Sequence, residues 1–339
     1  MKLNLSRLVI LLYCLYFLNP LYAQEKPAAS KDSSKTGSKY IDSLLRKDTT
    51  GLKKDTLNKT ATSDSTAPTP SHLELNLVYQ SNDVTNGRKD SSVIPLVTPK
   101  ISYIFKSGFQ VDLSVGYNVH DPSPQVNQYT LDGSYSFNPG NYSGSVTLSG
   151  FVYNKNSGST TSEQKGSLAY SSSYSFSFIQ PSLNLTWTFG NHIPDYQASP
   201  ALQQQFTIGN FNISPTVTMN AATQNSYNSY YQNRRFTIPR SSKPLPANVT
   251  LSGEVLNSDK FQILDYELSA PANFTAGNWT FNFTPTYALP VNPADIQAKL
   301  QINNVVKTYT YQEKLPNTFY FQIGATYSFL KKRSQPKAS

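Results

Sequence analysis

Apolar side chains fall on every second position through most of the chain between residues 72 and 329. The pattern is clearest in the stretch Thr318–Phe329, whose apolar positions are Phe319, Phe321, Ile323, Ala325, Tyr327 and Phe329. A period of two is that of a β-strand, because successive side chains point to opposite faces. The other face of this stretch is small and neutral, whereas an edge strand of a soluble sheet more often carries charge there. The pattern therefore predicts a strand with lipid on one side and water on the other.

Eleven earlier stretches alternate in the same way, so the sequence predicts about twelve strands. They are Leu73–Tyr79, Ile101–Phe105, Phe109–Val119, Tyr129–Phe137, Val146–Val152, Leu168–Phe176, Leu183–Phe189, Phe206–Ile208, Phe211–Met219, Leu264–Leu268 and Trp279–Leu289. The short connections between them lie near residues 106–108, 138–141, 177–181, 209–210 and 271–277. The other connections, most of them long, lie near 80–96, 120–125, 154–162, 190–203, 223–259 and 290–317.

Outer-membrane barrels alternate short periplasmic turns with longer external loops in this manner. We therefore predict an all-β fold, a transmembrane antiparallel up-and-down β-barrel that covers residues 71–330. A count of ten to fourteen strands fits the sequence, because residues 249–255 also alternate and the stretch at 206–208 is faint.

The last strand resembles a known signal. Gln322, Gly324, Tyr327 and Phe329 match the polar-x-Gly-x-x-hydrophobic-x-aromatic pattern at the C-terminus of bacterial outer-membrane β-barrels. This resemblance implies that the barrel-assembly machinery reads the strand. The sequence departs from the usual pattern in one respect, since residues 330–339 follow the terminal aromatic.

Two other segments, 211–224 and 263–271, are similar in style to Bacteroidota outer-membrane barrel proteins of undefined activity. That resemblance extends over residues 71–330 and implies a location, without adding any chemistry. The 23 tyrosines and 18 phenylalanines fit it, because such barrels carry aromatic girdles at both membrane interfaces.

The N-terminus predicts export. Lys2 and Arg7 precede an apolar run, and a cleavage site after Ala23 makes residues 1–23 a secretory signal peptide. The run is too short for a membrane-spanning helix. Cys14, the single cysteine, lies within it, so the mature chain has no cysteine for a disulfide or a metal site. Tyr13 is too large for the position before a lipidated cysteine, which argues against a lipoprotein.

Residues 24–70 are rich in Lys, Ser, Thr, Asp and Pro, and this composition predicts a disordered periplasmic linker. Residues 40–45 within it have the apolar spacing of a short amphipathic helix, which would suit a periplasmic partner. The alternative is a solvated tail with a transient helix, because so short a helix is marginal in water. Residues 331–339 are expected to form a basic periplasmic tail.

The formal net charge of +9 does not indicate nucleic-acid binding, because the excess positive charge lies outside the predicted barrel. Residues 71–330 contain 14 basic and 14 acidic residues, so the excess lies in the two terminal segments. The expected partners are therefore outer-membrane lipid, lipopolysaccharide and the barrel-assembly machinery, with no nucleic acid and no cofactor.

Charged residues that alternate with the lipid-facing positions should point into the barrel. They are Glu74, Lys100, Asp112, Asp132, Glu163, Lys165, Asp265 and Glu267. The predicted lumen is acidic, which favours either a cation-selective pore or an interior that is only filled by hydrogen-bonded polar side chains.

The longest predicted loop is basic and is a candidate plug. It carries Arg234, Arg235, Arg240 and Lys243. If the loop folds inward, these cations would pair with the lumen carboxylates, because arginine grips a carboxylate at two points. The alternative is that they stay outside, in solvent or on lipopolysaccharide phosphate.

Twelve-stranded barrels include a phospholipase with a Ser-His-Asn arrangement, so each of the three histidines is considered as a catalytic base. His120, at the outer rim, with Ser123 or another outer-rim serine is the candidate arrangement, although the sequence there reads more simply as a turn. The sequence thus favours a narrow channel or small-solute transporter that is not an enzyme. A surface-exposed structural or interaction barrel is the alternative, and a lipid hydrolase is a remote one.

Overall fold

The computed structural model describes residues 70–82, 84–89, 95–119, 125–154, 162–233, 249–302 and 305–330. The predicted signal peptide, the linker as far as Thr69 and the basic tail from residue 331 lie outside these residues, so the boundaries expected there stay predictions.

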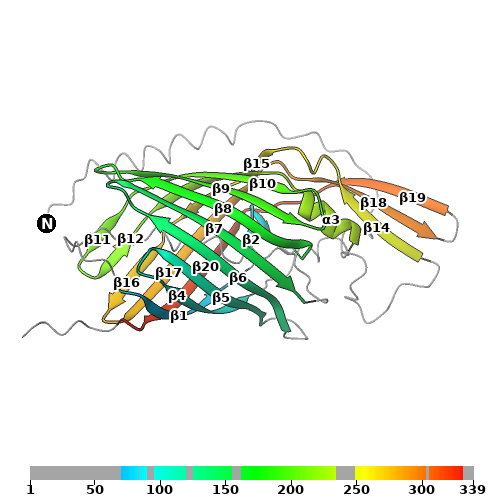
Figure 1. The fold of residues 1–339 in the computed structure, drawn as a ribbon. Coiled ribbons are helices and arrows are strands. Elements are labelled where there is room, and N and C mark those ends of the chain that lie inside the picture. The colour runs from blue at the N-terminus through cyan, green and yellow to red at the C-terminus, as the bar shows by residue number, and fades with distance from the viewer. Residues whose placement is uncertain are drawn as a thin grey trace, which may run out of the picture. The chain divides into compact units, whose positions relative to one another are not determined.

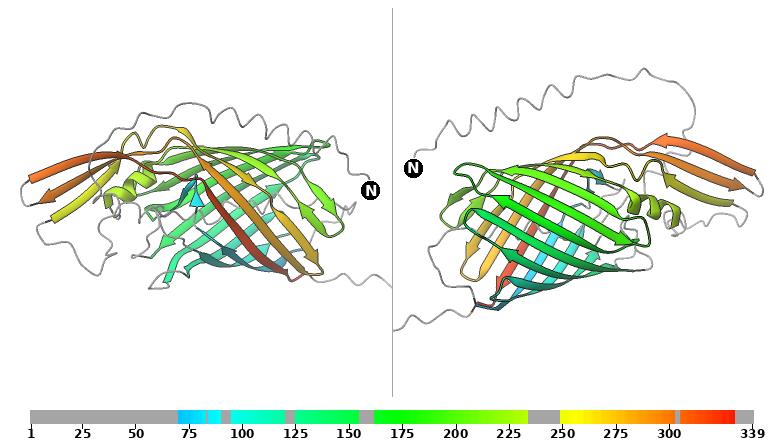
Figure 2. Two further views of the ribbon diagram at one scale, coloured as in Figure 1. Left: turned by 180° about the vertical axis from the view of Figure 1, so that it is seen from behind. Right: turned by 45° about the horizontal axis from the view of Figure 1, so that its top comes forward.

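Twelve antiparallel strands form a closed barrel (Figure 1, Figure 2). Every strand pairs with its neighbours, and β20 pairs with both β1 and β17, which closes the sheet on itself. The prediction of a β-barrel of about twelve strands is confirmed. The strands are β1 (His72–Gln80), β4 (Leu96–Ile104), β5 (Phe109–Asn118), β6 (Gln125–Phe137), β7 (Tyr142–Tyr153), β8 (Gln164–Tyr174), β9 (Gln180–Gly190), β10 (Asp195–Gln203), β13 (Thr216–Ala222), β15 (Gln262–Ser269), β17 (Trp279–Pro290) and β20 (Thr318–Ser328).

Alternation of side chains gives the barrel an apolar outside and a polar inside. In β20, for example, Phe319 is 61% exposed while its neighbour Tyr320 is 8% exposed. The same contrast recurs in β5, where Leu113 is exposed and Asp112 and Ser114 are buried. The core of this molecule is thus hydrogen-bonded and polar, whereas the large apolar side chains cover the outer surface.

Aromatic rings cluster on the outer surface near the end of the barrel that carries the short turns, here called the turn end. The turns there lie at residues 105–108, 138–141, 175–179 and 277–278. Ring pairs beside them include Tyr103 with Phe105 and Tyr327 with Phe329, each with centroids 4.7 Å apart. At the opposite, loop end, Trp187 lies 5.6 Å from Phe189. These are the positions of the two aromatic girdles of a membrane barrel.

Three barrel strands are completed toward the turn end by short strands that follow breaks in the ladder. β10 is followed by β11 (Phe206–Ile208), β12 (Phe211–Ile213) precedes β13, and β16 (Ala272–Ala276) follows β15. β11 pairs with β12, β12 with β16 and β16 with β17, so this extension stays part of the same sheet. Pro215 and Pro271 lie in two of the breaks, where a residue without an N–H interrupts the ladder.

The loop end carries further structure. A helix, α3 (Asn225–Asn233), lies there, together with a three-stranded sheet of β14 (Val249–Val255), β18 (Asp295–Ile302) and β19 (Val305–Gln312). All the views show this sheet extending beyond the barrel from the side on which α3 lies, and we call it the projecting sheet (Figure 1, Figure 2). A small hairpin, β2 (Val84–Thr85) and β3 (Arg88–Lys89), interrupts the connection between β1 and β4.

Several predicted connections contain strands in the structure. The predicted outer loop 190–203 contains β10, so the faint eighth strand at Phe206–Ile208 is only the continuation of a longer strand. Pro200 explains the error, because the β10–β13 register is interrupted beside it and proline is unusual within a sheet. Residues 249–255 do form a strand, but it belongs to the projecting sheet and adds nothing to the barrel count.

Among the described residues, no helix has the length and apolar character needed to cross a membrane.

Candidate functional site: the lumen and its mouth

The inner wall carries the acidic residues expected from the sequence. Asp112 and Asp265 are 0% exposed and Asp132 is 4% exposed, and Glu163 and Glu267 are also buried. Glu74 and Lys100 are half-buried and alternate with exposed apolar neighbours, so they too lie on the inner face.

Lys165 departs from this set. It is exposed, and it lies where the β8–β9 register shifts between Gln164 and Gly166. A β-bulge places an extra residue in one strand and disturbs the inward-outward alternation there. The prediction that Lys165 lines the lumen was therefore wrong.

The acidic residues occupy one part of the wall. Glu74 on β1, Asp112 on β5 and Asp132 on β6 lie toward the turn end, while Asp265 and Glu267 on β15 lie toward the loop end. Between them, strands β7 to β13 present mainly neutral hydroxyl and amide groups. The buried ones are Ser145, Ser149, Ser167, Ser173, Thr186, Thr216, Thr218 and Asn220. The lumen is thus negative on one side and neutral on the other.

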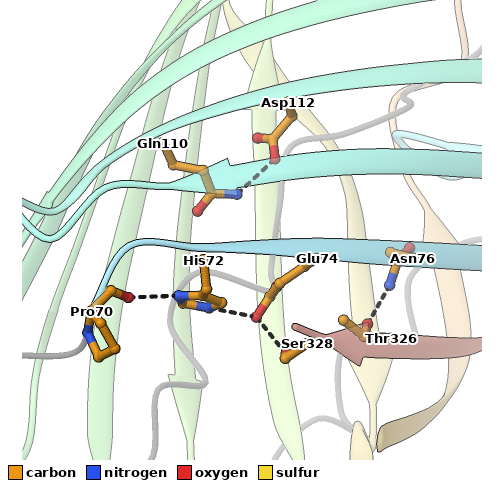
Figure 3. A network of polar contacts seen from close by, with 8 residues as sticks. All are labelled: Pro70, His72, Glu74, Asn76, Gln110, Asp112, Thr326 and Ser328. Carbon is orange, nitrogen blue, oxygen red and sulfur yellow. Dashed lines mark hydrogen bonds and ion pairs between the residues drawn. The ribbon is translucent and has the colours of Figure 1, made fainter. Parts of the chain in front are cut away.

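A polar network ties the first strand to the last at the turn end (Figure 3). Ser328 Oγ donates a 2.7 Å hydrogen bond to Glu74 Oε1, and Asn76 Nδ2 donates a 2.6 Å bond to Thr326 Oγ1. The same Glu74 oxygen lies 3.1 Å from His72 Nε2. These bonds hold the seam of the barrel, where two strands far apart in sequence meet.

This network does not have the geometry of a hydrolase. In a Ser-His-acid arrangement the histidine lies between the serine and the acid, so that it can accept the serine proton. Here Glu74 is the central group, and Ser328 donates to the carboxylate instead of to His72. The candidate pair His120 and Ser123 lies outside the described residues.

The β2–β3 hairpin lies inside the lumen at the loop end. Val84 is 4% exposed and packs with Ala288 of β17 and Tyr320 of β20, both on the inner wall. A Cβ added at Gly87 would lie 2.7 Å from the Cβ of Asp265, so the hairpin turn touches the β15 wall. The first outer loop therefore folds inward.

Asn86 and Gly87 at the tip of this hairpin have φ of 48° and 71°. Two consecutive positive φ values identify a type I′ turn, for which Asn-Gly is the favoured sequence. Asn86-Gly87, which lies between two β-branched and two basic residues, is a hairpin signal within the connection 80–96, for which only a loop was predicted.

Arg88 anchors the hairpin. Its Nε donates a 2.9 Å hydrogen bond to Oε2 of Glu313, and both side chains are buried. Its guanidinium carbon also lies 5.4 Å from the ring centroid of Tyr227, a cation–π distance. Burial of the guanidinium opposes its charge, but Glu313, with Tyr227 and Asp265 adding to it, raises the pKa of Arg88 above its ordinary value. Arg88 thus keeps its positive charge inside an acidic lumen.

Helix α3 holds Tyr227 in place. Asp195, at the start of β10, accepts hydrogen bonds from the backbone N–H groups of Asn225 and Ser226 at 2.6 and 2.8 Å. A carboxylate at a helix N-terminus satisfies donors that have no partner within the helix. The helix is therefore fixed to the rim of the barrel, and Tyr227 Oη reaches Glu313 Oε1 at 3.1 Å.

The predicted plug residues Arg234, Arg235, Arg240 and Lys243 lie outside the described residues. Among the described residues, Arg88, which lies in a different loop, interacts electrostatically with the lumen carboxylate Asp265. The sequence left open whether the arginines of 223–259 fold inward or stay outside, and that loop stays untested, whereas the described hairpin Val84–Lys89 does carry a buried arginine.

The four residues of the assembly signal also have structural roles. Gln322 Nε2 donates to Gln80 Oε1 at 2.9 Å across the seam. A Cβ at Gly324 would lie 2.3 Å from Oδ1 of Asn282, so any larger residue there would have to displace that side chain. Tyr327 packs edge-on against Trp279 as well as Phe329. Whether the assembly machinery reads these residues stays a prediction.

In the part of the chain that is described, no group of three or more His, Cys, Asp or Glu residues could hold a metal ion.

No known protein family matches the sequence, and no curated protein matches it either. Several solved structures of outer-membrane proteins are similar to it at a low level. The KdgM porin is 10% identical with a TM-score of 0.40, over 76% of this chain and 99% of that one. An outer-membrane channel from Pseudomonas putida F1 is 10% identical with a TM-score of 0.42, over 80% of this chain and 100% of that one. OmpF of Salmonella typhi is 9% identical with a TM-score of 0.31, over 76% and 97%. These likenesses are too distant to carry a functional argument, which must come from the geometry of the lumen.

Proposed function

We propose that this protein is an outer-membrane channel that conducts small solutes with a preference for cations. The observation that carries the proposal is the wall of buried carboxylates formed by Asp112, Asp132 and Asp265 inside a closed barrel. Fixed negative charge in a narrow, low-dielectric lumen attracts cations and repels anions.

The outer surface supports the membrane location. Exposed Leu, Val, Ile and aromatic side chains cover the barrel strands, and the aromatic pairs lie near both ends. A soluble protein rarely exposes so much contiguous apolar surface, whereas a membrane barrel requires it. The expected kinship with Bacteroidota barrels stays part of this proposal.

Planar-bilayer recording of the refolded protein tests the proposal. We expect discrete current steps and, in a KCl gradient, a reversal potential of the sign set by K⁺. Asp132→Asn should move that potential toward the non-selective value, because it removes a lumen charge. Glu254→Gln is the matched control, since Glu254 pairs with Lys299 on the projecting sheet. A folded barrel that passes no current, or one that prefers anions, would contradict the proposal.

A second candidate function is a surface-exposed interaction barrel. The projecting sheet favours it, because Ile302 and Val305 at its tip and Tyr309 in the middle of β19 are 41%, 60% and 54% exposed. The same bilayer recording separates the two functions, since an interaction barrel without a conducting lumen gives no current.

A further inference from the structure

Among the described residues, the β2–β3 hairpin forms a sheet of its own and shares no strand pairing with the barrel. Its two strands pair only with each other, through Val84 with Lys89 and Thr85 with Arg88, and they form a separate sheet. A two-stranded hairpin of this length is not stable by itself. The hairpin is therefore kept in the lumen by side-chain contacts with its surroundings, and not by the strand ladder that holds the wall.

Those contacts include an apolar contact and an ion pair. Val84 makes an apolar contact with Ala288 and Tyr320, and Arg88 makes the buried ion pair with Glu313. A buried ion pair contributes little net stability, because desolvation of both charges offsets their attraction. Removal of one partner has a larger effect, because the other charge stays buried without its main countercharge, and Arg88 would keep only the smaller contributions of Tyr227 and Asp265. The seated position of the hairpin thus depends strongly on Glu313.

Glu313 lies at the root of the projecting sheet. It directly follows β19, and its backbone N–H donates to the carbonyl of Ala294, which directly precedes β18. The same root packs against α3, where Ile296 and Tyr231, both 0% exposed, belong to one apolar cluster. The carboxylate that holds the hairpin is therefore part of the external sheet, and its position follows the position of that sheet.

We propose that the β2–β3 hairpin is a gate in the lumen and that Glu313 is its latch, so that displacement of the root of the projecting sheet releases the hairpin. The gate rests on the proposed channel function, since it controls the same lumen. In this proposal, a movement of the projecting sheet outside the barrel changes whether the pore is open.

A labelling experiment follows the hairpin without relying on conduction. Val84→Cys, in a Cys14→Ser background, places a single thiol at a position that is 4% exposed while the hairpin is seated. A membrane-impermeant maleimide applied to the refolded full-length barrel then reports how often the hairpin leaves its seat. Heat-modifiable migration on a gel shows in each variant that the barrel is folded.

Glu313→Gln should raise the labelling rate by roughly a hundredfold, because it removes the ion-pair partner of the buried Arg88. Glu254→Gln is the matched control: the same change on the same sheet, at a carboxylate that is about one-third exposed and pairs with Lys299. It should leave the rate unchanged. Equal labelling rates for Glu313→Gln and Glu254→Gln in folded barrels would show that Glu313 does not hold the hairpin.

Ile296→Ala tests this effect of the projecting sheet. It loosens the root of the sheet from α3 but leaves Arg88 and Glu313 intact. We expect an intermediate rise in labelling, and that rise should vanish when Glu313→Gln is already present, because both act through the same carboxylate. Additive effects of the two changes would show that the sheet does not act through Glu313.

Conductance then connects the hairpin to the pore. A disulfide between Val84→Cys and Ala288→Cys, two positions of one buried apolar cluster, should hold the gate closed, and a reductant should restore current. If cross-linking leaves the current unchanged, the hairpin is not a gate, although the channel function stands. If Glu313→Gln releases the hairpin and still no current flows, the channel function fails independently of the moving hairpin.

Discussion

Asp112 on β5 and Asp132 on β6 are direct cross-strand partners, and both carboxylates are buried on the inner wall of the barrel. Gln110 Nε2 donates a 2.7 Å hydrogen bond to Asp112 Oδ1, whereas Asp132 Oδ1 meets no hydrogen-bond donor among the described residues. Like charges directly opposite each other destabilise a sheet. The pair therefore lowers the stability of the barrel and places two negative charges on its inner wall.

Asp132→Asn should stabilise the barrel by about 1 kcal/mol, because it removes the repulsion from Asp112 and supplies an amide donor. Urea unfolding of the refolded protein in detergent measures this difference. Asp295→Asn is the control, since Asp295 is an exposed acid on the projecting sheet. A less stable Asp132→Asn barrel would mean that the carboxylate is stabilised by a partner and is not strained.

Gly324→Ala should reduce the amount of folded barrel, because the new methyl group would overlap Oδ1 of Asn282. The double variant Gly324→Ala/Asn282→Ala separates packing from signalling. If packing alone requires the glycine, the second change restores outer-membrane accumulation and heat-modifiability. If the assembly machinery reads Gly324, accumulation stays low while refolding in detergent recovers.

Phe329→Ala should lower the outer-membrane amount of the protein, because Phe329 ends the predicted assembly signal and packs against Tyr327. Truncation after Leu330 should have little effect, since it spares the whole of β20. Cell fractionation followed by immunoblotting compares the two. Equal accumulation of Phe329→Ala and the unaltered chain would count against the signal.

Asp195→Ala should loosen helix α3, because it removes the carboxylate that accepts hydrogen bonds from Asn225 and Ser226. Loss of a helix cap costs about 1 kcal/mol. Hydrogen exchange over residues 225–233 should become several times faster while exchange in the barrel strands stays slow. Asp195→Asn, which retains an acceptor, should give a smaller change, and identical exchange in both variants would argue against the cap.

Removal of Glu25 to Pro68 should leave a heat-modifiable barrel, because the first barrel strand begins at His72. Gel migration with and without boiling checks this. Failure of the shortened chain to insert or fold would show that the segment contributes a strand or a plug.

The sequence by itself determined the wall of this barrel. A period of two is a local property, since each residue faces the side opposite to its neighbour whatever lies far away in the chain. The lipid-facing positions of β20 and the inward direction of Asp112 follow from that period alone. The same local rule failed at Lys165, because a bulge there breaks the alternation. It also failed to predict β10, because that strand contains Pro200 and few large apolar side chains.

Only the tertiary structure decided what lies inside and beside the wall. Glu313 meets Arg88 across 225 residues of sequence, and no periodicity connects two residues that lie in different loops. The partner of a buried charge is set by the closure of the barrel, which brings the connection after β1 beside the connection before β20. The physical reason is that strand character is encoded residue by residue, whereas the pairing of loop charges depends on distances that exist only after the first strand has met the last.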